Sequence, residues 1–382
     1  MRKPGFYFLL CSLLLNSYAG YAHLTKDTIQ SEGRFPFTVK FDIENARSTL
    51  ALLGSKQVSE KELDNWLASP GTRALIRKLN STPAIARSAM IKAIENKKED
   101  ADENKYQYAH IRQQLNSMQL FLNRLTLSAD SITRAICEEL RPFRSSGNDT
   151  VILYGLMGGY SAGFAFTNNK SAFYMGLHFY KGDITGVAVS AKHELFHTIQ
   201  SAEYRFEPVM ENLRQTDSAW EAPYYLLRHL FLEGSAEFVA DNEPYLKTSP
   251  YLRREHEHGI VNTYRHEAVF YLIEHLLLDA FYKPSLMDFG QLYSILFDWN
   301  WNNPAYYAGK HMMAVLVKEY GPGYLEKSLR RDALYFIRDY MQLANSGRIA
   351  GAYNFSAGFQ QLVDAMLHQV EKHQPAAGTV TH

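Results

Sequence analysis

Two histidines, His193 and His197, stand four positions apart, and Glu194 directly follows the first. Residues four apart lie on the same face of a helix, so these two imidazoles can bind one metal ion. Neutral imidazole nitrogens suit Zn²⁺, and Glu194 projects from a neighbouring angle, where it can accept a proton from a metal-bound water. Apolar residues on both sides of the motif favour a helix. The motif therefore predicts a zinc site with a general base; the alternative is a surface helix with scattered histidines.

A catalytic zinc site needs a third protein ligand and an open position for water. The segment 230–240 is the best source, because its helical pattern puts Glu233 and Glu237 on one face among apolar neighbours. Two carboxylates on an otherwise buried helix are costly unless a partner compensates them. We expect Glu233 to be the third ligand and Glu237 to accept a hydrogen bond from a zinc-bound imidazole. The small residues Gly234 and Ala236 predict close packing on the first helix, whereas a half-exposed amphipathic helix is the alternative.

Other polar residues near these motifs have simpler interpretations. His229 lies one turn before Glu233 and is a competing ligand or substrate contact, although neither role is favoured. Cys137 sits in an apolar helical pattern, which predicts a buried and unreactive thiol. The run 253–258 is expected to be a solvated loop or helix end and not a second metal site. No serine stands in a nucleophile-elbow setting, which argues against a serine hydrolase.

Hydrophobic periodicity indicates how the chain presents these residues. Residues 108–125 repeat apolar positions at helical spacing, and a second helix over 132–140 is ended by Pro142. The charge-rich run 96–105 is expected to be a solvated connector. Two strands are predicted, over residues 151–157 and 173–180. After them, helices are predicted as far as the tail.

Composition limits the class of protein. The 382 residues include 40 Lys+Arg and 40 Asp+Glu, and 46% of them are apolar, which excludes disorder for most of the chain. Zero formal charge argues against a nucleic-acid partner, which selects for a basic surface. Arg2 and Lys3 precede an apolar run, 6–15, with Gly20 and Ala22 at small-residue positions, which predicts a cleaved signal peptide. We therefore expect a secreted or periplasmic protein without stable membrane insertion.

The two motifs together carry a resemblance. His193-Glu194-x-x-His197 followed by Glu233-Gly234-x-Ala236-Glu237 resembles the gluzincin branch of zinc metallopeptidases, and is most similar to secreted bacterial zinc-dependent peptidase families. The resemblance covers about residues 145–330. It implies a zincin-like α+β fold that is mostly α, with a small twisted sheet over the active-site helix. The expected segments are a signal peptide (1–22), an N-terminal helical region (23–145), the sheet and active-site helix (146–205), a helical subdomain carrying the third ligand (206–373) and a flexible tail (374–382).

A further match concerns the oxyanion. Tyr306-Tyr307-Ala308-Gly309 resembles the Tyr-x-Lys-Gly of aminopeptidase N–type gluzincins, whose tyrosine stabilises the tetrahedral oxyanion. The resemblance implies this role for Tyr306, with Tyr307 as the fallback, although Ala308 departs from the lysine. The Gly-x-Met-Glu-Asn signature of those exopeptidases is absent, and the spacing from the histidines to Glu233 exceeds theirs. Both departures argue against that particular enzyme family.

These residues predict a secreted zinc metallopeptidase with one Zn²⁺, acting on peptide or protein substrates. Glu194 is expected to be the general base, and the strand at 172–180 is expected to align an extended substrate. Tyr264 and His266 are alternative transition-state donors. The open alternatives are an inactive metal-binding scaffold, a zinc hydrolase of a non-peptide amide, and a helical partner-binding protein without metal.

Overall fold

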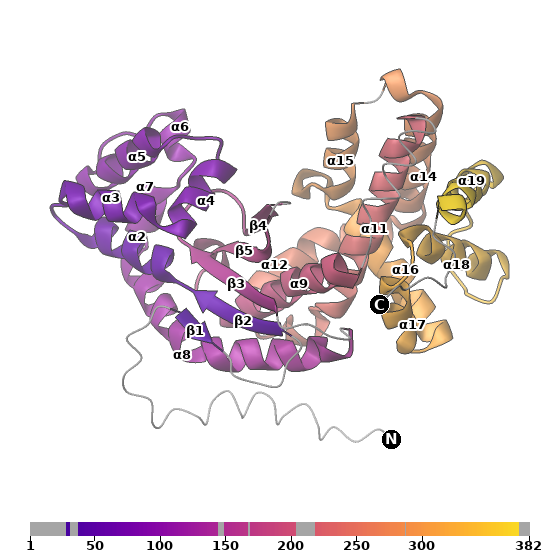
Figure 1. Cartoon of the computed structure of the whole chain (residues 1–382), viewed down its shortest axis with the longest axis horizontal. Coiled ribbons are helices and arrows are strands. Elements are labelled where there is room, and N and C mark those ends of the chain that lie inside the picture. The colour runs from indigo at the N-terminus through magenta and orange to yellow at the C-terminus, as the bar shows by residue number, and fades with distance from the viewer. Residues whose placement is uncertain are drawn as a thin grey trace.

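The computed structural model describes residues 28–30, 37–143, 149–166, 169–203, 218–286 and 288–373. Helices predominate there and one small sheet accompanies them, which confirms a mostly helical α+β fold (Figure 1). The predicted signal peptide and flexible tail lie outside the described residues. None of the helices in these ranges combines the length and the apolarity that a bilayer crossing requires.

The sheet has five strands in the order β1-β2-β3-β5-β4. The strands are β1 (Thr28–Gln30), β2 (Phe37–Asp42), β3 (Asp149–Leu156), β4 (Gly163–Phe166) and β5 (Asn169–Gly176). The three central strands are parallel, and the short outer strands β1 and β4 run antiparallel to their neighbours. Val39, Phe41, Val151 and Leu153 are almost completely buried, so one face of the sheet belongs to the core.

Helices surround the sheet on the N-terminal side and form a separate group on the C-terminal side (Figure 1). The first group is α2 (Glu44–Gly54), α3 (Glu60–Ala68), α4 (Pro70–Lys78), α5 (Pro83–Glu95), α6 (Ala101–Asn104), α7 (Tyr108–Gln113) and α8 (Leu115–Leu140). Helix α9 (Ile184–Glu203) follows the sheet and contacts β5 and α8. The remaining helices are α11 (Glu221–Val239), α12 (Pro250–Gly259), α13 (Val261–Tyr264), α14 (His266–Tyr282), α15 (Phe289–Phe297), α16 (Pro304–Tyr320), α17 (Gly323–Leu329), α18 (Ala333–Asn345) and α19 (Ala357–His373).

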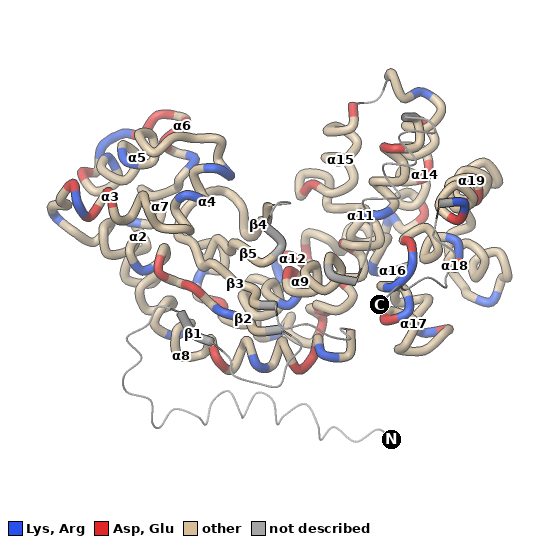
Figure 2. Tube along the Cα trace, in the orientation of Figure 1, with Lys and Arg blue, Asp and Glu red and all other residues tan. Residues whose placement is uncertain are grey.

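Helix α11 is the central element of the C-terminal group, because it contacts α9, α14, α16 and α18. Acidic and basic residues are interspersed along the outer helices (Figure 2), in line with the equal numbers of both in the sequence. Cys137 is fully buried in α8, as expected from its apolar surroundings.

Four expectations about the elements need correction. The N-terminal region is not only helical, because β1 and β2 join the sheet from within it. The helix expected over 108–125 is interrupted at Gln114, and α8 then continues without a break to Leu140. The strand expected over 173–180 ends at Gly176, where a 3₁₀ turn (Leu177–Tyr180) begins. That strand is also an inner one, because β4 covers its outer edge.

The charged run 96–105 is the fourth correction. Asp100 and Glu103 form a capping box that starts α6, and this turns the Glu103 side chain inward to 4% exposure. There Lys92 Nζ lies 2.6 Å from its carboxylate and the Ser88 hydroxyl donates to it at 2.5 Å. Burial alone would raise the pKa of Glu103, but the hydrogen bonds from Lys92, Ser88 and the Asp100 N–H lower it to about 2.

Candidate metal centre

The two histidines are presented by a helix whose start is firmly fixed. The Asp183 carboxylate accepts a hydrogen bond from the Gly186 N–H at 2.9 Å in the first turn of α9. Its other oxygen accepts from the Ser249 hydroxyl at 2.6 Å and from the Tyr251 N–H at 2.9 Å. One carboxylate therefore joins α9 to the beginning of α12.

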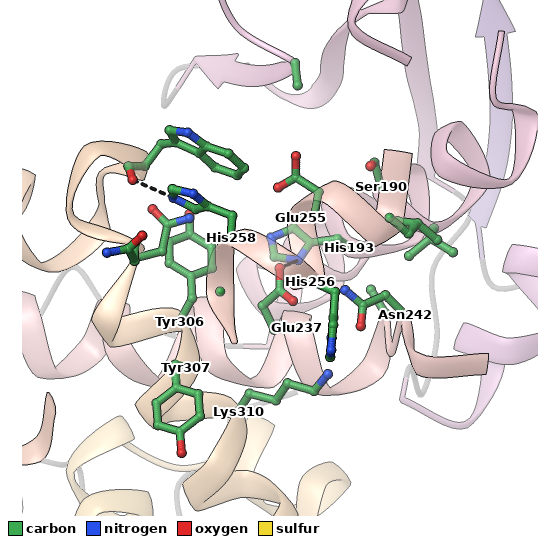
Figure 3. Close-up of a pocket in the computed structure, with 18 of the residues that line it drawn as sticks. Ser190, His193, Glu237, Asn242, Glu255, His256, His258, Tyr306, Tyr307 and Lys310 are labelled. Carbon is green, nitrogen blue, oxygen red and sulfur yellow. Dashed lines mark hydrogen bonds and ion pairs between the residues drawn. The ribbon is translucent and has the colours of Figure 1, made fainter. Parts of the chain in front are cut away.

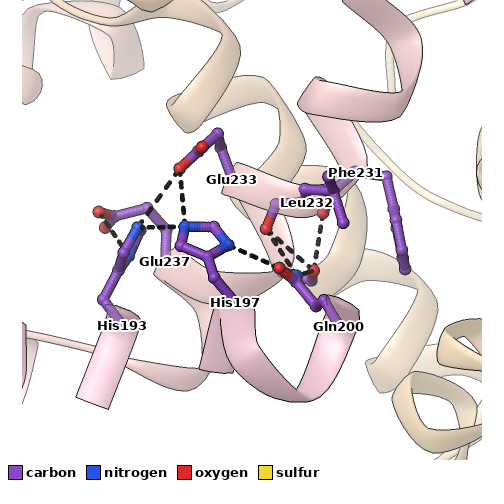
Figure 4. A network of polar contacts seen from close by, with 8 residues as sticks. His193, His197, Gln200, Phe231, Leu232, Glu233 and Glu237 are labelled. Atoms are coloured by element: carbon purple, nitrogen blue, oxygen red, sulfur yellow. Dashed lines mark hydrogen bonds and ion pairs between the residues drawn. The ribbon is translucent and has the colours of Figure 1, made fainter. Parts of the chain in front are cut away.

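Three donor atoms from α9 and α11 converge on one point (Figure 4). Glu233 Oε2 lies 3.3 Å from His193 Nε2 and 3.2 Å from His197 Nε2, and the two nitrogens are 3.1 Å apart. The three side chains form a group able to hold a metal ion. The structure thus brings together the three ligands expected from two motifs that are far apart in the sequence.

The size of this triangle suits zinc. Ligand atoms about 2.0–2.1 Å from a tetrahedral zinc are separated from one another by roughly 3.3–3.4 Å, close to the observed edges. Glu233 Oε2 is buried, and apart from the two imidazoles, which donate to it only when protonated, it has no hydrogen-bond donor among the described residues. A buried carboxylate oxygen without a donor is costly, and a divalent cation compensates it. The donor set and its geometry therefore fit one Zn²⁺.

The protonation equilibria of the site are strongly coupled. Burial disfavours the charged form of His197, but the Glu233 carboxylate outweighs burial and raises the pKa of this imidazole to about 9. Burial likewise opposes the charge on Glu233, and the two imidazoles nevertheless hold the pKa of its carboxyl well below the usual range. Because a metal needs the unprotonated nitrogens, metal binding at this site displaces protons.

Neighbouring side chains orient both imidazoles (Figure 4). His197 Nδ1–H donates to Gln200 Oε1 at 2.6 Å, which leaves the lone pair of Nε2 directed at the site. The Gln200 amide in turn donates to the Leu232 carbonyl and to the Ser235 hydroxyl, both at 2.8 Å. Glu237 Oε1 lies 3.4 Å from His193 Nδ1, where it was expected to act on a zinc-bound imidazole. Gln200 was not identified from the sequence, although its position three residues after His197 is the signal for it.

Glu194 lines a cavity of about 710 Å³ next to these ligands. Burial raises the pKa of its carboxyl above the usual value. The first residue of β4, Gly163, lies against it: a Cβ at Gly163 would be 3.3 Å from Glu194 Oε1. The carboxylate therefore stands between the metal ligands and the outer strand of the sheet.

The two tyrosines of the 306–309 motif take different positions. Tyr306 lines the cavity with its ring nearly parallel to the His193 ring, at 6.3 Å between centroids (Figure 3). Burial raises the pKa of its phenol well above the usual value, so the hydroxyl stays protonated. Tyr307 also lines the cavity, but its hydroxyl lies 3.0 Å from His266 Nδ1. The geometry favours Tyr306 over Tyr307 as an oxyanion donor.

The remaining candidates lie elsewhere. Tyr264 is 81% exposed, and neither it nor His266 is among the residues that line the cavity. The His229 Nδ1 donates to the Tyr225 carbonyl at 2.9 Å, and burial lowers the pKa of this imidazole to about 4. His229 does not belong to the group of His193, His197 and Glu233 that could hold a metal ion.

Gly234 was expected to allow close packing of α11 on α9, but it lies against a different helix. A Cβ built on Gly234 would lie 2.3 Å from the Gly309 backbone, so this glycine allows close approach to α16 and not to α9. The side of α11 that faces α9 carries Ser235, which is fully buried and bonded to Gln200.

Residues 63–348 match a family model described as "Putative zinc dependent peptidase (DUF5700)". The chain belongs to this family. The match extends from within α3 to beyond α18, so the DUF5700 region includes β3, β4, β5, α9, α11 and α16, whereas β1 and β2 precede it. No curated protein and no solved structure matches the chain. The zinc dependence in the family description agrees with the donor set formed by His193, His197 and Glu233.

Proposed function

We propose that this chain is a secreted zinc metallopeptidase of the gluzincin type, which hydrolyses peptide bonds with Glu194 as general base. The observation that carries the proposal is the convergence of His193, His197 and Glu233 next to a cavity of about 710 Å³, which is lined by His193 and by the Glu194 carboxylate. The membership in the DUF5700 family supports both the metal and the class of reaction.

His193, His197 and Glu233 would hold the ion. Bound Zn²⁺ supplies a Lewis acid that polarises the scissile carbonyl and lowers the pKa of a coordinated water. Glu194 accepts the proton of the attacking water on its carboxylate and passes it to the leaving amine. Its raised pKa suits this exchange, because a base whose pKa approaches the working pH both accepts and returns a proton.

Two further groups complete the proposed machinery. The hydroxyl of Tyr306, a residue that lines the cavity, is protonated and donates a hydrogen bond to the developing oxyanion. Glu237 orients the His193 ring through Nδ1, as carboxylates next to metal-bound histidines commonly do. Its contribution is to the position of a ligand and not to the reacting atoms.

The substrate strand is proposed to lie along β4. β5 is enclosed between β3 and β4, so it is not available for main-chain pairing with a peptide. β4 is the outer strand, its far edge pairs with no other strand among the described residues, and it begins against Glu194. An extended peptide added to that edge would pass the general base.

Secretion is proposed from the N-terminal 22 residues, which have the basic, apolar and small-residue order of a cleaved signal. N-terminal sequencing of protein recovered from the periplasm or the medium tests this. A mature chain that begins near His23 is expected, and a chain that keeps Arg2 and Lys3 would contradict it.

The decisive experiment combines metal analysis with hydrolysis. Purified protein is expected to contain one zinc per chain and to cleave a peptide mixture until a chelator removes the metal. Glu194→Gln should keep the zinc and lose roughly 10²–10⁴-fold in turnover, the usual contribution of a general base. Zinc without cleavage would indicate a metal-binding scaffold. Cleavage of small amides without peptides, detected by mass spectrometry, would indicate another zinc hydrolase, and protein without metal would overturn the proposal.

A further inference from the structure

One wall of the active-site cavity is formed by α12, whose residues 253–258 were expected to be a solvated loop or helix end. Glu255, His256 and His258 of this helix all line the cavity, and Figure 3 shows the Glu255 carboxylate on the same side as His193 and Ser190. The wall is fixed relative to the metal ligands, because the Asp183 carboxylate that caps α9 also holds the first turn of α12. Glu255 is therefore part of a rigid cavity and not a freely moving surface group.

The Glu255 carboxylate is largely removed from water without receiving a cation. No Lys or Arg of the described residues forms an ion pair with it. The Tyr251 hydroxyl donates a hydrogen bond to it, and Arg254 acts on it only from a distance. Burial, with the nearby Glu237 as the second cause, raises the pKa of Glu255 to about 7. A cation next to this carboxylate would stabilise its charged form.

The other charges of the cavity supply no such cation. Lys310 is the one Lys or Arg among the described residues that line it, and its ammonium already lies 3.0 Å from Asp241. Glu237 faces His193, and Glu194 serves the chemistry. The complementary positive group is therefore expected on the substrate.

We propose that Glu255 binds an ammonium or guanidinium group of the peptide substrate and so makes the enzyme selective for cationic peptides. This inference rests on the proposed peptidase function and names its substrate class. Two sources share this chemistry, namely the side chain of a lysine or arginine near the scissile bond and the free amino terminus of the peptide. A carboxylate that is largely removed from water binds either of them more strongly than an exposed carboxylate does.

The test compares kcat/KM of the zinc-loaded full chain on matched synthetic peptides. The parent peptide carries lysine near the cleaved bond and a free amino terminus. In one derivative the lysine is acetylated, and in the other the amino terminus is acetylated. Wild-type protein is expected to lose at least tenfold in kcat/KM on one of the two derivatives, which also identifies the source of the cation. Equal cleavage of all three peptides would overturn the proposal and leave the peptidase function intact.

Variants assign the preference to Glu255. Glu255→Gln should bring the ratio of kcat/KM between parent and neutral peptide close to one. The matched control is Glu257→Gln, on the same helix but exposed, which should keep the wild-type ratio. Zinc content and melting temperature are measured for both variants. A Glu255→Gln protein that folds, holds zinc and keeps the full preference would overturn the assignment.

A binding measurement separates recognition from turnover. In a Glu194→Gln background, calorimetry should show that Glu255→Gln weakens binding of the parent peptide and leaves binding of the neutral derivative nearly unchanged. Equal weakening for both peptides would overturn charge recognition. If no peptide is cleaved and none binds, the proposed peptidase function itself is wrong, together with the proposed role of Glu255.

Discussion

Gly234 of α11 and Gly309 of α16 contact each other backbone to backbone. A Cβ on Gly234 would lie 2.3 Å from Gly309 Cα, and a Cβ on Gly309 would lie 2.3 Å from the Leu230 carbonyl oxygen. This contact lies one residue after Glu233, the proposed third ligand, and three residues after Tyr306. It therefore sets the distance between the metal ligand on one helix and the proposed oxyanion donor on the other.

We predict that Gly309→Ala separates these two helices. The added methyl meets backbone atoms that cannot turn aside, so we expect about 1–3 kcal/mol lower free energy of unfolding. Because Glu233 and Tyr306 move with their helices, zinc affinity and kcat should fall as well. Urea unfolding, zinc titration and peptide hydrolysis measure the three effects.

The control for this substitution is Gly323→Ala, at the start of α17, where an added Cβ meets no atom within 4 Å. It is expected to change stability by less than about 1 kcal/mol and to leave zinc binding unchanged. If Gly309→Ala behaved like this control, the contact would not determine the geometry of the site.

A second prediction concerns Gln200, which joins the His197 imidazole to the backbone and hydroxyl of α11. Gln200→Met keeps the approximate shape but removes the acceptor for Nδ1–H, so His197 loses its fixed tautomer. We expect zinc to bind 10–100-fold more weakly, the usual range for such partners of metal ligands. Competition with a chelator measures this, with Gln361→Met on the exposed side of α19 as control. Equal zinc affinity of the two variants would contradict the role.

A third prediction separates the two adjacent tyrosines. Tyr306→Phe removes a hydroxyl that faces the cavity, and we expect kcat to fall by about 10²–10³-fold with a small change in KM, as for loss of one oxyanion donor. Tyr307→Phe removes the contact with His266, so it should lower the free energy of unfolding and leave kcat nearly unchanged. Steady-state kinetics of both variants measure these effects. A larger loss of kcat in Tyr307→Phe would assign the oxyanion role to Tyr307 instead of Tyr306.

The grouping of His193, His197 and Glu233 was predictable because helical spacing is a local property. The four-residue interval between His193 and His197 determines their common direction, and an unpaired carboxylate at Glu233 signals a partner. Gln200 and Glu255 depend on which helices pack together, which their own segments do not encode. The partner of Gly234 was assigned to the wrong helix for the same reason.

The sheet shows the same division between local and long-range information. β3 was predicted from its continuous apolar run, whereas β2 was missed, although Val39 and Phe41 alternate with polar residues over a few positions. A strand this short is weak evidence alone, and its place in the sheet depends on parallel pairing with β3, more than 100 residues later.

A fourth prediction is a pH dependence of stability at Glu103. The pKa of its carboxyl is about 2 in the folded protein against 4.5 without the fold, so its contribution is complete above about pH 4.5 and disappears as the pH falls toward 2. At neutral pH we expect Glu103→Gln to lose on the order of 2–3 kcal/mol of unfolding free energy, and the difference from wild type should vanish near pH 2. Chemical unfolding at several pH values measures it. Asp102→Asn, which affects only an exposed pair with Lys105, should show no comparable pH dependence.

The fifth prediction tests whether β4 pairs with the substrate backbone. An N-methyl group on a peptide bond removes one main-chain donor and sterically blocks strand pairing at that position. Loss of one or two such hydrogen bonds, about 0.5–1.5 kcal/mol each, should lower kcat/KM by roughly twofold to more than a hundredfold. A peptide methylated one residue at a time around the scissile bond would show this as losses at alternate positions, because alternate residues of a strand face the β4 edge. Methylation far from the scissile bond is the control. Equal losses of kcat/KM at all positions near the bond would indicate that the methyl groups are too large for the cavity, and that the peptide backbone does not pair with β4.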